Sequence, residues 1–221
     1  MVPEGIYLKN PDSSELGIKI IVGAIDLIHE LGFEAFNFRR LSAHINTTEA
    51  SIYRYFESKY KLLLYITAWY WGWLDYRLLI GTANILDPKE KLKRAIQIVT
   101  ENIENDSTFQ HISENKLHHI VITESSKAYL TRQIEDHSEE GVFGGYKQII
   151  ERIADIILEV NPQFKYAKML VSTCIEGAHL QRFFGTNLPM LTDSVNTRDL
   201  KNKDRVSDFF ELLIMRTISS N

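Results

Sequence analysis

The chain has 221 residues, of which 44% are hydrophobic and 24% are charged, so it is long enough for one large domain or two small ones with a real core. Its 5 prolines and 11 glycines argue against a β-sandwich or a proline-rich linker protein. Its only cysteine, Cys174, excludes an internal disulfide and a cysteine-based zinc site, and we interpret it as a small buried hydrophobe. We find no secretory signal and no apolar run of the roughly 18 residues that span a membrane, and therefore predict a cytoplasmic protein.

The formal net charge of −4 does not point to nucleic acid as a partner, but the charge is unevenly placed. Residues 36–61 contain five basic and two acidic residues, a net charge of +3, which leaves −7 for the rest of the chain. A basic patch on an acidic body is typical of a docking surface. A chance cluster on a solvated helix face would give the same count, so charge alone does not decide between the two.

The first predicted helix begins near Asp12 and ends at Gly32. Asp12 can cap this helix, and Glu15 follows three residues later, which is a variant of the capping box. Glycine commonly ends a helix because it adopts the left-handed conformation without strain. The apolar positions that follow at helical spacing are Ile18, Ile21, Ile25 and Ile28.

Two short helices follow, over residues 38–45 and 48–54, with a polar corner between them. Asn37 caps the first and Thr48 the second, and Asn46 suits the corner because asparagine tolerates the left-handed conformation. A helix this short is marginal by itself, so both must be stabilised by packing. The residues placed between the two helices are Leu41, Ser42, Ile45 and Ile52.

Every later element is also predicted to be a helix, so the fold class is all-α. Ser58 caps a long helix that is apolar all round and should be buried between neighbours. Asp87-Pro88 opens another helix, Asn161-Pro162 breaks the chain, and the polar stretch 185–204 is typical of a loop. The predicted helices cover residues 59–80, 88–105, 109–124, 126–137, 142–160, 163–185 and 204–218.

The first three predicted helices make a helix-turn-helix, because a tight polar corner separates the last two. The N-terminus of the helix after Thr48 carries free backbone N–H groups and the positive end of the helix dipole, which suit a phosphate or a base edge. Glu49, Ala50 and Ser51 are short or polar, as a helix that enters the major groove requires. The pattern therefore predicts a helix that is presented to DNA.

Residues 16–63 resemble the DNA-binding domain of the tetracycline-repressor (TetR) family of bacterial regulators. The sequence departs from the usual pattern of that family at Asn46 and Ala50, where glycine is common, and at Thr47, where a hydrophobic residue is common. Beyond residue 63 the resemblance is one of architecture, an all-helical remainder of suitable length. The matching motifs run without a gap: Gly32-Phe33, Asn37, Leu41-Ser42, Ile45-Asn46-Thr47-Thr48, Ile52-Tyr53-Arg54-Tyr55-Phe56 and Ser58-Lys59.

The resemblance implies an N-terminal helix-turn-helix DNA-binding domain, residues 1–58, joined to a helical effector-binding and dimerisation domain, residues 59–221. It implies a ligand-responsive transcriptional regulator that represses by binding operator DNA and is released by a small, largely apolar effector. It implies no enzyme activity and no cofactor.

The resemblance also assigns roles within the DNA-binding domain. Tyr53 and Lys59 would contact phosphate, Arg54 would contact DNA or Glu57, and Phe56 would pack inward. The DNA-binding residues carried over are Asn37, Arg39, Thr47, Thr48, Glu49, Ser51, Tyr53, Arg54 and Lys59.

The aromatic run of the helix at 59–80 suits a mostly apolar ligand cavity with a few polar anchors, although packing alone would also explain it. The histidines lack metal-binding spacing, so we predict no metal. Neither a nucleophile motif nor a Gly-rich phosphate loop is present, and "GVFGG" at 141–145 is interpreted as a helix break. The predicted ligand-binding residues are Trp69, Trp73, Tyr76, His118, His119, Thr123, Glu176 and His179.

Apolar stripes on two successive helices predict a twofold dimer built on a four-helix bundle, with Gly177 allowing close approach. A twofold dimer is also what a helix-turn-helix needs to read two half-sites. The competing interpretations are an all-helical enzyme or small-molecule-binding protein that has lost DNA binding, and an activator or protein-docking module. The predicted dimer residues are Ile149, Ile150, Ile153, Ile157, Val160, Ala167, Leu170, Val171, Cys174 and Ala178.

Overall fold

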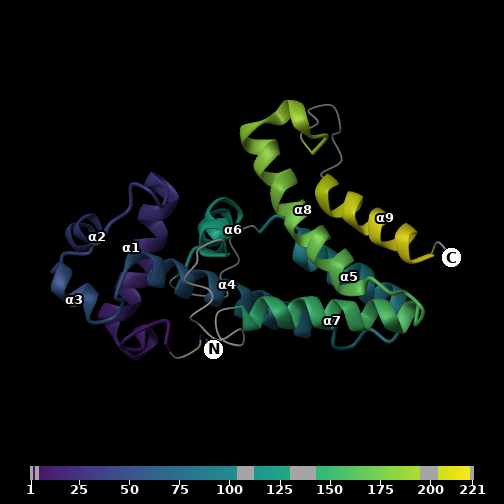
Figure 1. Cartoon of the computed structure of the whole chain (residues 1–221), viewed down its shortest axis with the longest axis horizontal. Helices are drawn as coiled ribbons and strands as arrows, with labels where there is room; N and C mark the ends of the chain where they lie inside the picture. The colour runs from purple at the N-terminus through teal and green to yellow at the C-terminus, as the bar shows by residue number, and fades with distance from the viewer. Residues whose placement is uncertain (1, 3–4, 104–111, 130–142, 195–203, 220–221) are drawn as a thin grey trace. The chain divides into compact units, whose positions relative to one another are not determined.

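The structure is a computed structural model that describes residues 2, 5–103, 112–129, 143–194 and 204–219. Every regular element in these ranges is helical, as the sequence predicts (Figure 1). The α-helices are α1 Glu15–Leu31, α2 Phe38–His44, α3 Glu49–Tyr53, α4 Lys59–Thr82, α5 Pro88–Thr100, α6 Glu114–Tyr129, α7 Gly144–Val160, α8 Ala167–Asn187 and α9 Arg205–Ser219, and the 3-10 helices are η1 Pro11–Ser13 and η3 Pro189–Leu191.

The chain divides into two compact units. The first contains residues 1–72 and 103–144, and the second contains residues 73–102 and 145–221, so that α4 begins in the first unit and ends in the second. Because α6 packs on α1, it belongs to the same unit as the predicted helix-turn-helix. The boundary predicted after residue 58 thus falls inside the first unit.

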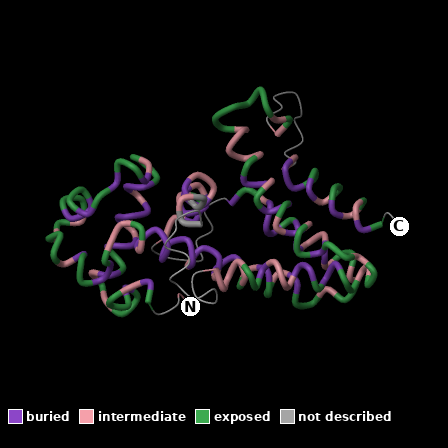
Figure 2. Tube along the Cα trace, viewed as in Figure 1, coloured by how far each residue is buried: buried purple, intermediate pink, exposed green. Residues whose placement is uncertain are grey.

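The first unit is built around α1. One face of this helix is buried (Figure 2), and Ile20 and Ala24 on it have no exposed surface. The helix ends at Gly32, whose φ of 75° lies in the left-handed region. Aromatic residues from the following turn, from the segment before α4 and from α4 itself complete the core. Fully buried among them are Phe33, Phe36, Phe56 and Tyr65.

In the second unit, α5, α8 and α9 pack against one another. Gly177 of α8 faces Phe210 of α9, and a Cβ at this glycine would lie only 2.9 Å from the Phe210 Cζ. The close approach predicted at Gly177 is therefore confirmed, but the neighbour is a helix of the same chain.

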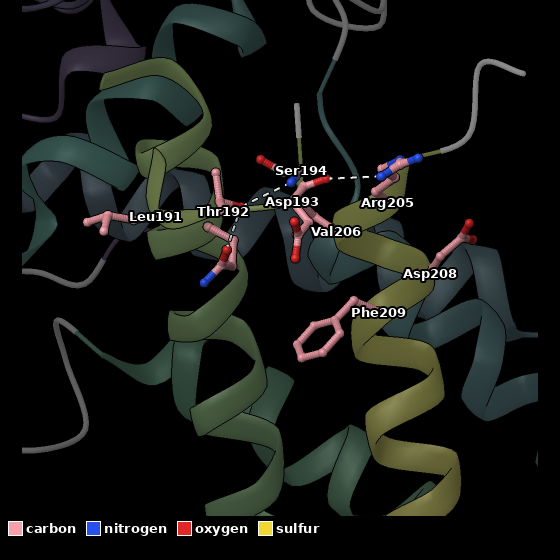
Figure 3. A pocket seen from close by; sticks show the side chains of 9 residues that line it. Leu191, Thr192, Asp193, Ser194, Arg205, Val206, Asp208 and Phe209 are labelled. Carbon is pink, nitrogen blue, oxygen red and sulfur yellow. Dashed lines mark hydrogen bonds between the residues drawn. The ribbon is translucent and has the colours of Figure 1, made fainter. Parts of the chain in front are cut away.

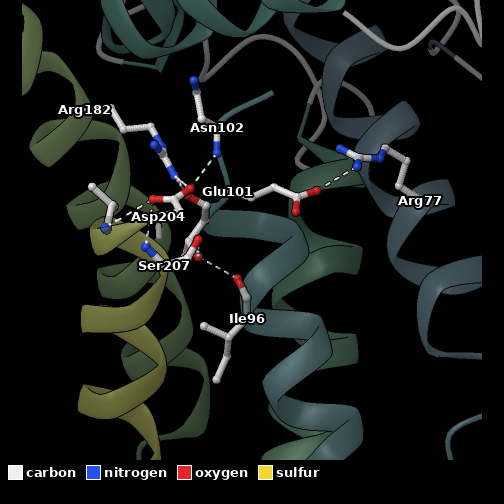
Figure 4. A network of polar contacts seen from close by, with 9 residues as sticks. Arg77, Ile96, Glu101, Asn102, Arg182, Asp204 and Ser207 are labelled. Carbon is white, nitrogen blue, oxygen red and sulfur yellow. Dashed lines mark hydrogen bonds and ion pairs between the residues drawn. The ribbon is translucent and has the colours of Figure 1, made fainter. Parts of the chain in front are cut away.

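A polar network fixes the start of α9 (Figure 4). The Asp204 carboxylate accepts an ion-pair hydrogen bond from Arg182 of α8 at 2.7 Å, and it also accepts from the backbone N–H groups of Asn102, Val206 and Ser207. Burial raises the pKa of the Asp204 carboxyl, but Arg182 and the backbone donors outweigh that effect and hold the pKa below its usual value. Arg182 also donates to the Thr100 carbonyl oxygen, which joins the end of α5 to the same network.

Several predicted helix boundaries were wrong. α1 begins at Glu15 rather than near Asp12, because the Ser14 Oγ accepts from the Gly17 N–H at 3.1 Å and caps the helix. α5 ends at Thr100, before residue 105, and α8 begins at Ala167, after residue 163. α6 runs through the break predicted at residue 125, and residues 130–137 of the helix predicted there lie outside the described residues.

The predicted dimer stripes also need correction. Most of those side chains are already covered within one chain; Ile149, Ile157 and Ala178, for example, have no exposed surface. A side chain without exposed surface cannot contact a partner unless the chain opens, so these residues are core. Buried with them are Ile153, Ala167, Val171 and Cys174, whereas Ile150, Val160 and Leu170 are partly exposed.

Candidate nucleic-acid interface

The corner between α2 and α3 has the geometry of a helix-turn-helix. The Asn37 Oδ1 accepts from the Arg40 N–H at 2.9 Å, and the Thr48 Oγ1 accepts from the Ser51 N–H at 3.2 Å, so both predicted caps are confirmed. Asn46 has a φ of 52°, the left-handed conformation predicted for it. Leu41 and Ile52 have no exposed surface and lie between the helices, which fixes the corner from inside.

The N-terminal edge of α3 is exposed. Thr48, Glu49 and Ala50 are all exposed, whereas Thr47 and Ser51 are half-buried. The Thr47 N–H donates to the Ser42 carbonyl oxygen at 2.9 Å, which ties the corner to α2. The predicted reading residues thus lie on one continuous edge, with short side chains around a single carboxylate.

The aromatic residues at the end of α3 separate into exposed and buried members. Tyr53 is half exposed and packs edge-to-face on Phe38, with ring centroids 4.9 Å apart. Phe56 is fully buried, as predicted. No role was predicted for Tyr55, which is buried and shares a 2.8 Å hydrogen bond with the Ser14 hydroxyl at the start of α1.

Arg39 and Arg54 are the exposed arginines of this corner that were predicted to contact DNA. Arg39 lies in the first turn of α2, two residues after Asn37, and Arg54 follows α3 directly. Both cations flank the exposed edge of α3 in the sequence, and both are available to a polyanion.

Lys59 was predicted to contact phosphate, but the structure gives its ammonium group a different set of partners. The Lys59 Nζ donates to the carbonyl oxygens of Phe33 at 3.0 Å, Glu34 at 3.3 Å and Phe36 at 3.2 Å. The ammonium also lies 4.6 Å from the centroid of the Phe33 ring. An ammonium has three donors, and all three are used inside the chain.

The turn between α1 and α2 also receives contacts from α6. The Phe33 N–H donates to the buried Glu124 Oε1 at 3.2 Å, and Lys127 pairs with Glu124 at 2.8 Å and with Glu34 at 3.0 Å. The hydrogen bond and charge of Lys127 lower the pKa of the Glu34 carboxyl, and the hydrogen bond to Glu124 raises the pKa of Lys127 despite partial burial. The sequence showed no sign of these contacts, because Glu124 and Phe33 are 91 positions apart.

The predicted ligand-binding residues are divided between the two units. Trp69, His118, His119 and Thr123 lie in the first unit, and Trp73, Tyr76, Glu176 and His179 lie in the second. Within the first unit, His118 is buried and shares a 2.8 Å hydrogen bond with the Tyr70 hydroxyl, and the Thr123 hydroxyl donates to the His119 carbonyl oxygen. His119 packs on the His29 ring at 4.9 Å, and burial, followed by the neighbouring His29, lowers its pKa.

In the second unit, Trp73 is buried beneath the guanidinium of Arg77, which lies 5.0 Å from its ring centroid. Tyr76 and Glu176 are exposed, so neither lines an enclosed cavity, and Glu176 accepts a hydrogen bond from the Tyr146 hydroxyl at 2.8 Å. His179 is buried, and burial, with a smaller contribution from Arg182, lowers its pKa to about 4.

Two pockets of the second unit lie away from the predicted ligand-binding residues. One, of about 450 Å³, lies between the end of α8 and the start of α9 and is lined by Gln181, Thr192, Arg205 and Phe209 among others (Figure 3). The other, of about 560 Å³, is mostly polar and lies along α7, with Arg152, Asp155 and Glu159 in its wall. Neither pocket includes any of the eight residues predicted to bind a ligand.

Within the described ranges, no group of three or more histidine, cysteine or acidic side chains is arranged to hold a metal ion. None of the helices in that part of the chain is long and apolar enough to cross a membrane.

Comparison with known proteins agrees with this geometry. Residues 20–66 match the family described as bacterial regulatory proteins, tetR family. No curated protein matches the sequence at a significant level.

Solved structures match along most of the chain. A transcriptional regulator from Saccharomonospora viridis, solved in complex with choline, has 21% identity and a TM-score of 0.58 over 92% of this chain and 95% of that one. The fatty acid degradation regulator FadR from Bacillus halodurans has 16% identity and a TM-score of 0.61 over 89% and 92%. AibR, in complex with isovaleryl coenzyme A and operator DNA, has 15% identity and a TM-score of 0.55 over 88% and 95%.

At these identities the structural matches establish the fold of the chain. The sequence match establishes the family of the N-terminal segment. Residues 20–66 therefore form the helix-turn-helix domain of the tetR family of bacterial regulatory proteins, in a chain whose described elements are all helical and that has the fold of solved transcriptional regulators.

Proposed function

We propose that the protein is a DNA-binding transcriptional regulator that reads DNA with the exposed edge of α3. The observation that carries this proposal is the combination of a fixed interior and an exposed edge: Leu41 and Ile52 lock the corner, while Thr48 and Glu49 face solvent. A short helix held in this way can enter a major groove without losing its support.

Within this interface the roles differ. Thr47, Thr48, Glu49 and Ser51 are placed to read base edges, and Glu49 suits a cytosine amino group because a carboxylate only accepts hydrogen bonds. Asn37, Arg39, Tyr53 and Arg54 are placed to contact the backbone, where they would add affinity without sequence preference.

Selection of DNA from a random-sequence pool by the purified protein tests this function. Glu49→Gln should change the selected sequence, whereas Glu57→Gln, which alters another exposed carboxylate outside α3, should leave it unchanged. Arg54→Gln should weaken binding to all sequences alike. If the wild-type chain enriches no sequence and binds no DNA, the alternative holds: an all-helical small-molecule-binding protein or enzyme that has lost DNA binding.

We further propose that the protein acts as a twofold dimer through exposed faces of α8 and α9. On α8, Met169, Thr173, Glu176 and Leu180 are exposed at helical spacing. On α9, apolar side chains outside the buried face are exposed as well. They are Phe209, Leu212 and Leu213. Such faces favour burial against a second copy, which would also supply the second reading head that an operator with two half-sites needs.

Sedimentation measurements test the dimer. Leu212→Glu should raise the dimer dissociation constant at least tenfold, because it places a charge in an apolar interface. Leu86→Glu is the matched control, since Leu86 is 96% exposed in the connection between α4 and α5. A wild-type monomer at micromolar concentration would contradict the dimer and the operator geometry that depends on it.

We propose that a small, largely apolar effector lowers the affinity for DNA, which would make the protein a repressor. Support for an apolar effector comes from the aromatic interior around α4. Two of the similar structures are complexes with choline and isovaleryl coenzyme A, which supports a bound small molecule but not its apolar character. The effector would act by binding one of two conformations better than the other.

Choline and isovaleryl coenzyme A are suitable first probes in a thermal-shift and DNA-release assay. Trp69→Ala and Trp73→Ala should abolish release and keep DNA binding. If both variants still respond to a ligand that releases the wild-type protein, the effector binds elsewhere, and the 450 Å³ pocket beside α9 becomes the next candidate.

A further inference from the structure

The backbone of the α1–α2 turn, residues 32–36, is held by side chains from three different helices. All four carbonyl oxygens from Phe33 to Phe36 accept hydrogen bonds from cationic side chains. Lys59 serves three of them at 3.0 to 3.3 Å, and the Arg40 Nη1 serves the Ala35 oxygen at 3.0 Å. A set of carbonyl oxygens that converges on one ammonium group defines the path of the chain through this turn.

The site around Lys59 is shaped for an ammonium group. Three acceptors match its three donors, and the centroid of the Phe33 ring lies 4.6 Å from the nitrogen. An arginine carries the same charge, but its planar fork cannot direct donors to three carbonyl oxygens around a single point.

The turn is also joined to α6. The buried Glu124 carboxylate accepts from the Phe33 N–H at 3.2 Å, and Lys127 reaches Glu34 at 3.0 Å. The same short turn therefore connects α1 and α2 to α4 through Lys59 and to α6 through Glu124.

We propose that Lys59 is a positioning residue of the DNA-reading head and does not contact phosphate. By fixing the α1–α2 turn on the first residue of α4, it sets where α2 begins, because Asn37 caps α2 directly after Phe36. α3 packs on α2, so its exposed edge is set by the same contact. The effect on DNA rests on the proposed function, whereas the effect on the turn does not.

Three variants separate the two roles of Lys59. Lys59→Met removes the ammonium and keeps most of the stem, and Lys59→Arg keeps the charge but not the geometry. Lys61→Met is the matched control, because Lys61 lies in the same turn of α4 as Lys59. Its Nζ donates to the Gly5 carbonyl oxygen, whereas that of Lys59 donates to the α1–α2 turn.

The first measurement is amide hydrogen exchange in the protein without DNA. The informative amides are those of Phe36, Arg40 and Leu41, which bond within the turn and the first turn of α2. We expect Lys59→Met and Lys59→Arg to speed their exchange about tenfold or more relative to wild type, and Lys61→Met to leave it unchanged. Unchanged exchange in both Lys59 variants overturns the proposal.

The second measurement is the salt dependence of DNA affinity. The logarithm of the binding constant falls as the logarithm of the salt concentration rises, and each lost phosphate contact makes this slope less steep by about 0.9 per reading head. We expect both Lys59 variants to bind more weakly with the wild-type slope. A less steep slope in Lys59→Met together with wild-type binding by Lys59→Arg overturns the proposal, since a phosphate tolerates either cation.

If the wild-type chain binds no DNA, the proposed function fails, and the exchange measurement still decides what Lys59 does. If Lys59→Met does not fold, Lys59→Arg decides alone. Its faster exchange supports the proposal, and its wild-type exchange and affinity contradict it.

Discussion

The short helices α2 and α3 and the long helices α7 and α8 are stabilised in different ways. Together, α2 and α3 contain only four buried residues, Phe38, Leu41, Ser42 and Ile52. Each helix, however, is capped by a side chain that accepts a hydrogen bond from a backbone N–H of its first turn. Together, α7 and α8 contain eleven buried residues, and no side chain caps the N-terminus of α8. The short pair depends on hydrogen bonds at its ends, and the long pair depends on buried apolar area.

The difference shows how support for a helix limits what its surface can do. The short helices leave most of their side chains exposed, which suits a surface that must contact a partner. The long helices cover their apolar stripes with other helices of the same chain, so their function at a surface depends on the opposite face. Four changes test this contrast, in order of decreasing effect.

Ile157→Ala should lower the free energy of unfolding by about 2–5 kcal/mol, because it opens a cavity where the side chain has no exposed surface. Denaturant titration at two protein concentrations measures the loss, which should not depend on concentration. Leu212→Ala, at an exposed position of α9, should change the stability of the single chain by less than about 0.5 kcal/mol. If the loss of unfolding free energy in Ile157→Ala depends on protein concentration, Ile157 contributes to the dimer interface after all.

Acid should lower the free energy of unfolding through His179 of α8. Burial lowers the pKa of His179 to about 4 in the folded chain, whereas a histidine in the unfolded chain has a pKa near 6.5. The stability contributed by the neutral imidazole is therefore fully present above pH 6.5 and is lost as pH falls from 6.5 to about 4. The loss is on the order of 3 kcal/mol. His179→Gln should flatten the unfolding free energy measured over this range, and His44→Gln, at an exposed position of α2, should not.

Asp204→Ala should cost about 2 kcal/mol, because it leaves Arg182 without its carboxylate and α9 without its cap. Thermal unfolding measures the loss. Asp208→Ala removes an exposed carboxylate from the first turn of the same helix and should have a much smaller effect. Equal losses in the two variants would show that the network contributes nothing beyond charge at the helix end.

Thr48→Ala should cost about 1 kcal/mol and speed exchange of the Ser51 amide, because the cap of α3 is lost. Thr48→Ser keeps the hydroxyl and should behave as wild type. If the alanine variant keeps the wild-type exchange rate, packing of Ile52 alone holds α3, and the contrast with the long helices disappears.

The same contrast explains which features could be predicted from the sequence. Asn37 and Thr48 act within three residues, so their roles as caps could be recognised from local sequence and were confirmed. The apolar periodicity of residues 142–160 and 163–185 correctly predicted two helices. It could not show that other elements of the same chain cover those stripes, because periodicity identifies a buried face without identifying its partner.

The DNA-binding domain shows a second limit. The position of Lys59 at the start of α4 suggested a phosphate ligand, but its partners are backbone carbonyl oxygens 23 to 26 residues earlier, and backbone atoms carry no residue-specific signal in the sequence. Glu124 was missed for the same reason, since it accepts from a backbone N–H. Contacts of side chains with distant backbone are those that a single sequence reveals least.

The carbonyl contacts of Lys59 have a consequence for sequence drift during evolution. Lys59 recognises the backbone of the α1–α2 turn, so the exposed side chains of Glu34 and Ala35 can be exchanged without altering the atoms it binds. Lys59 itself has no such freedom, because even a charge-conserving change to arginine alters the geometry. Among relatives of this protein that keep the contact, we therefore expect a variable turn opposite an unvarying lysine.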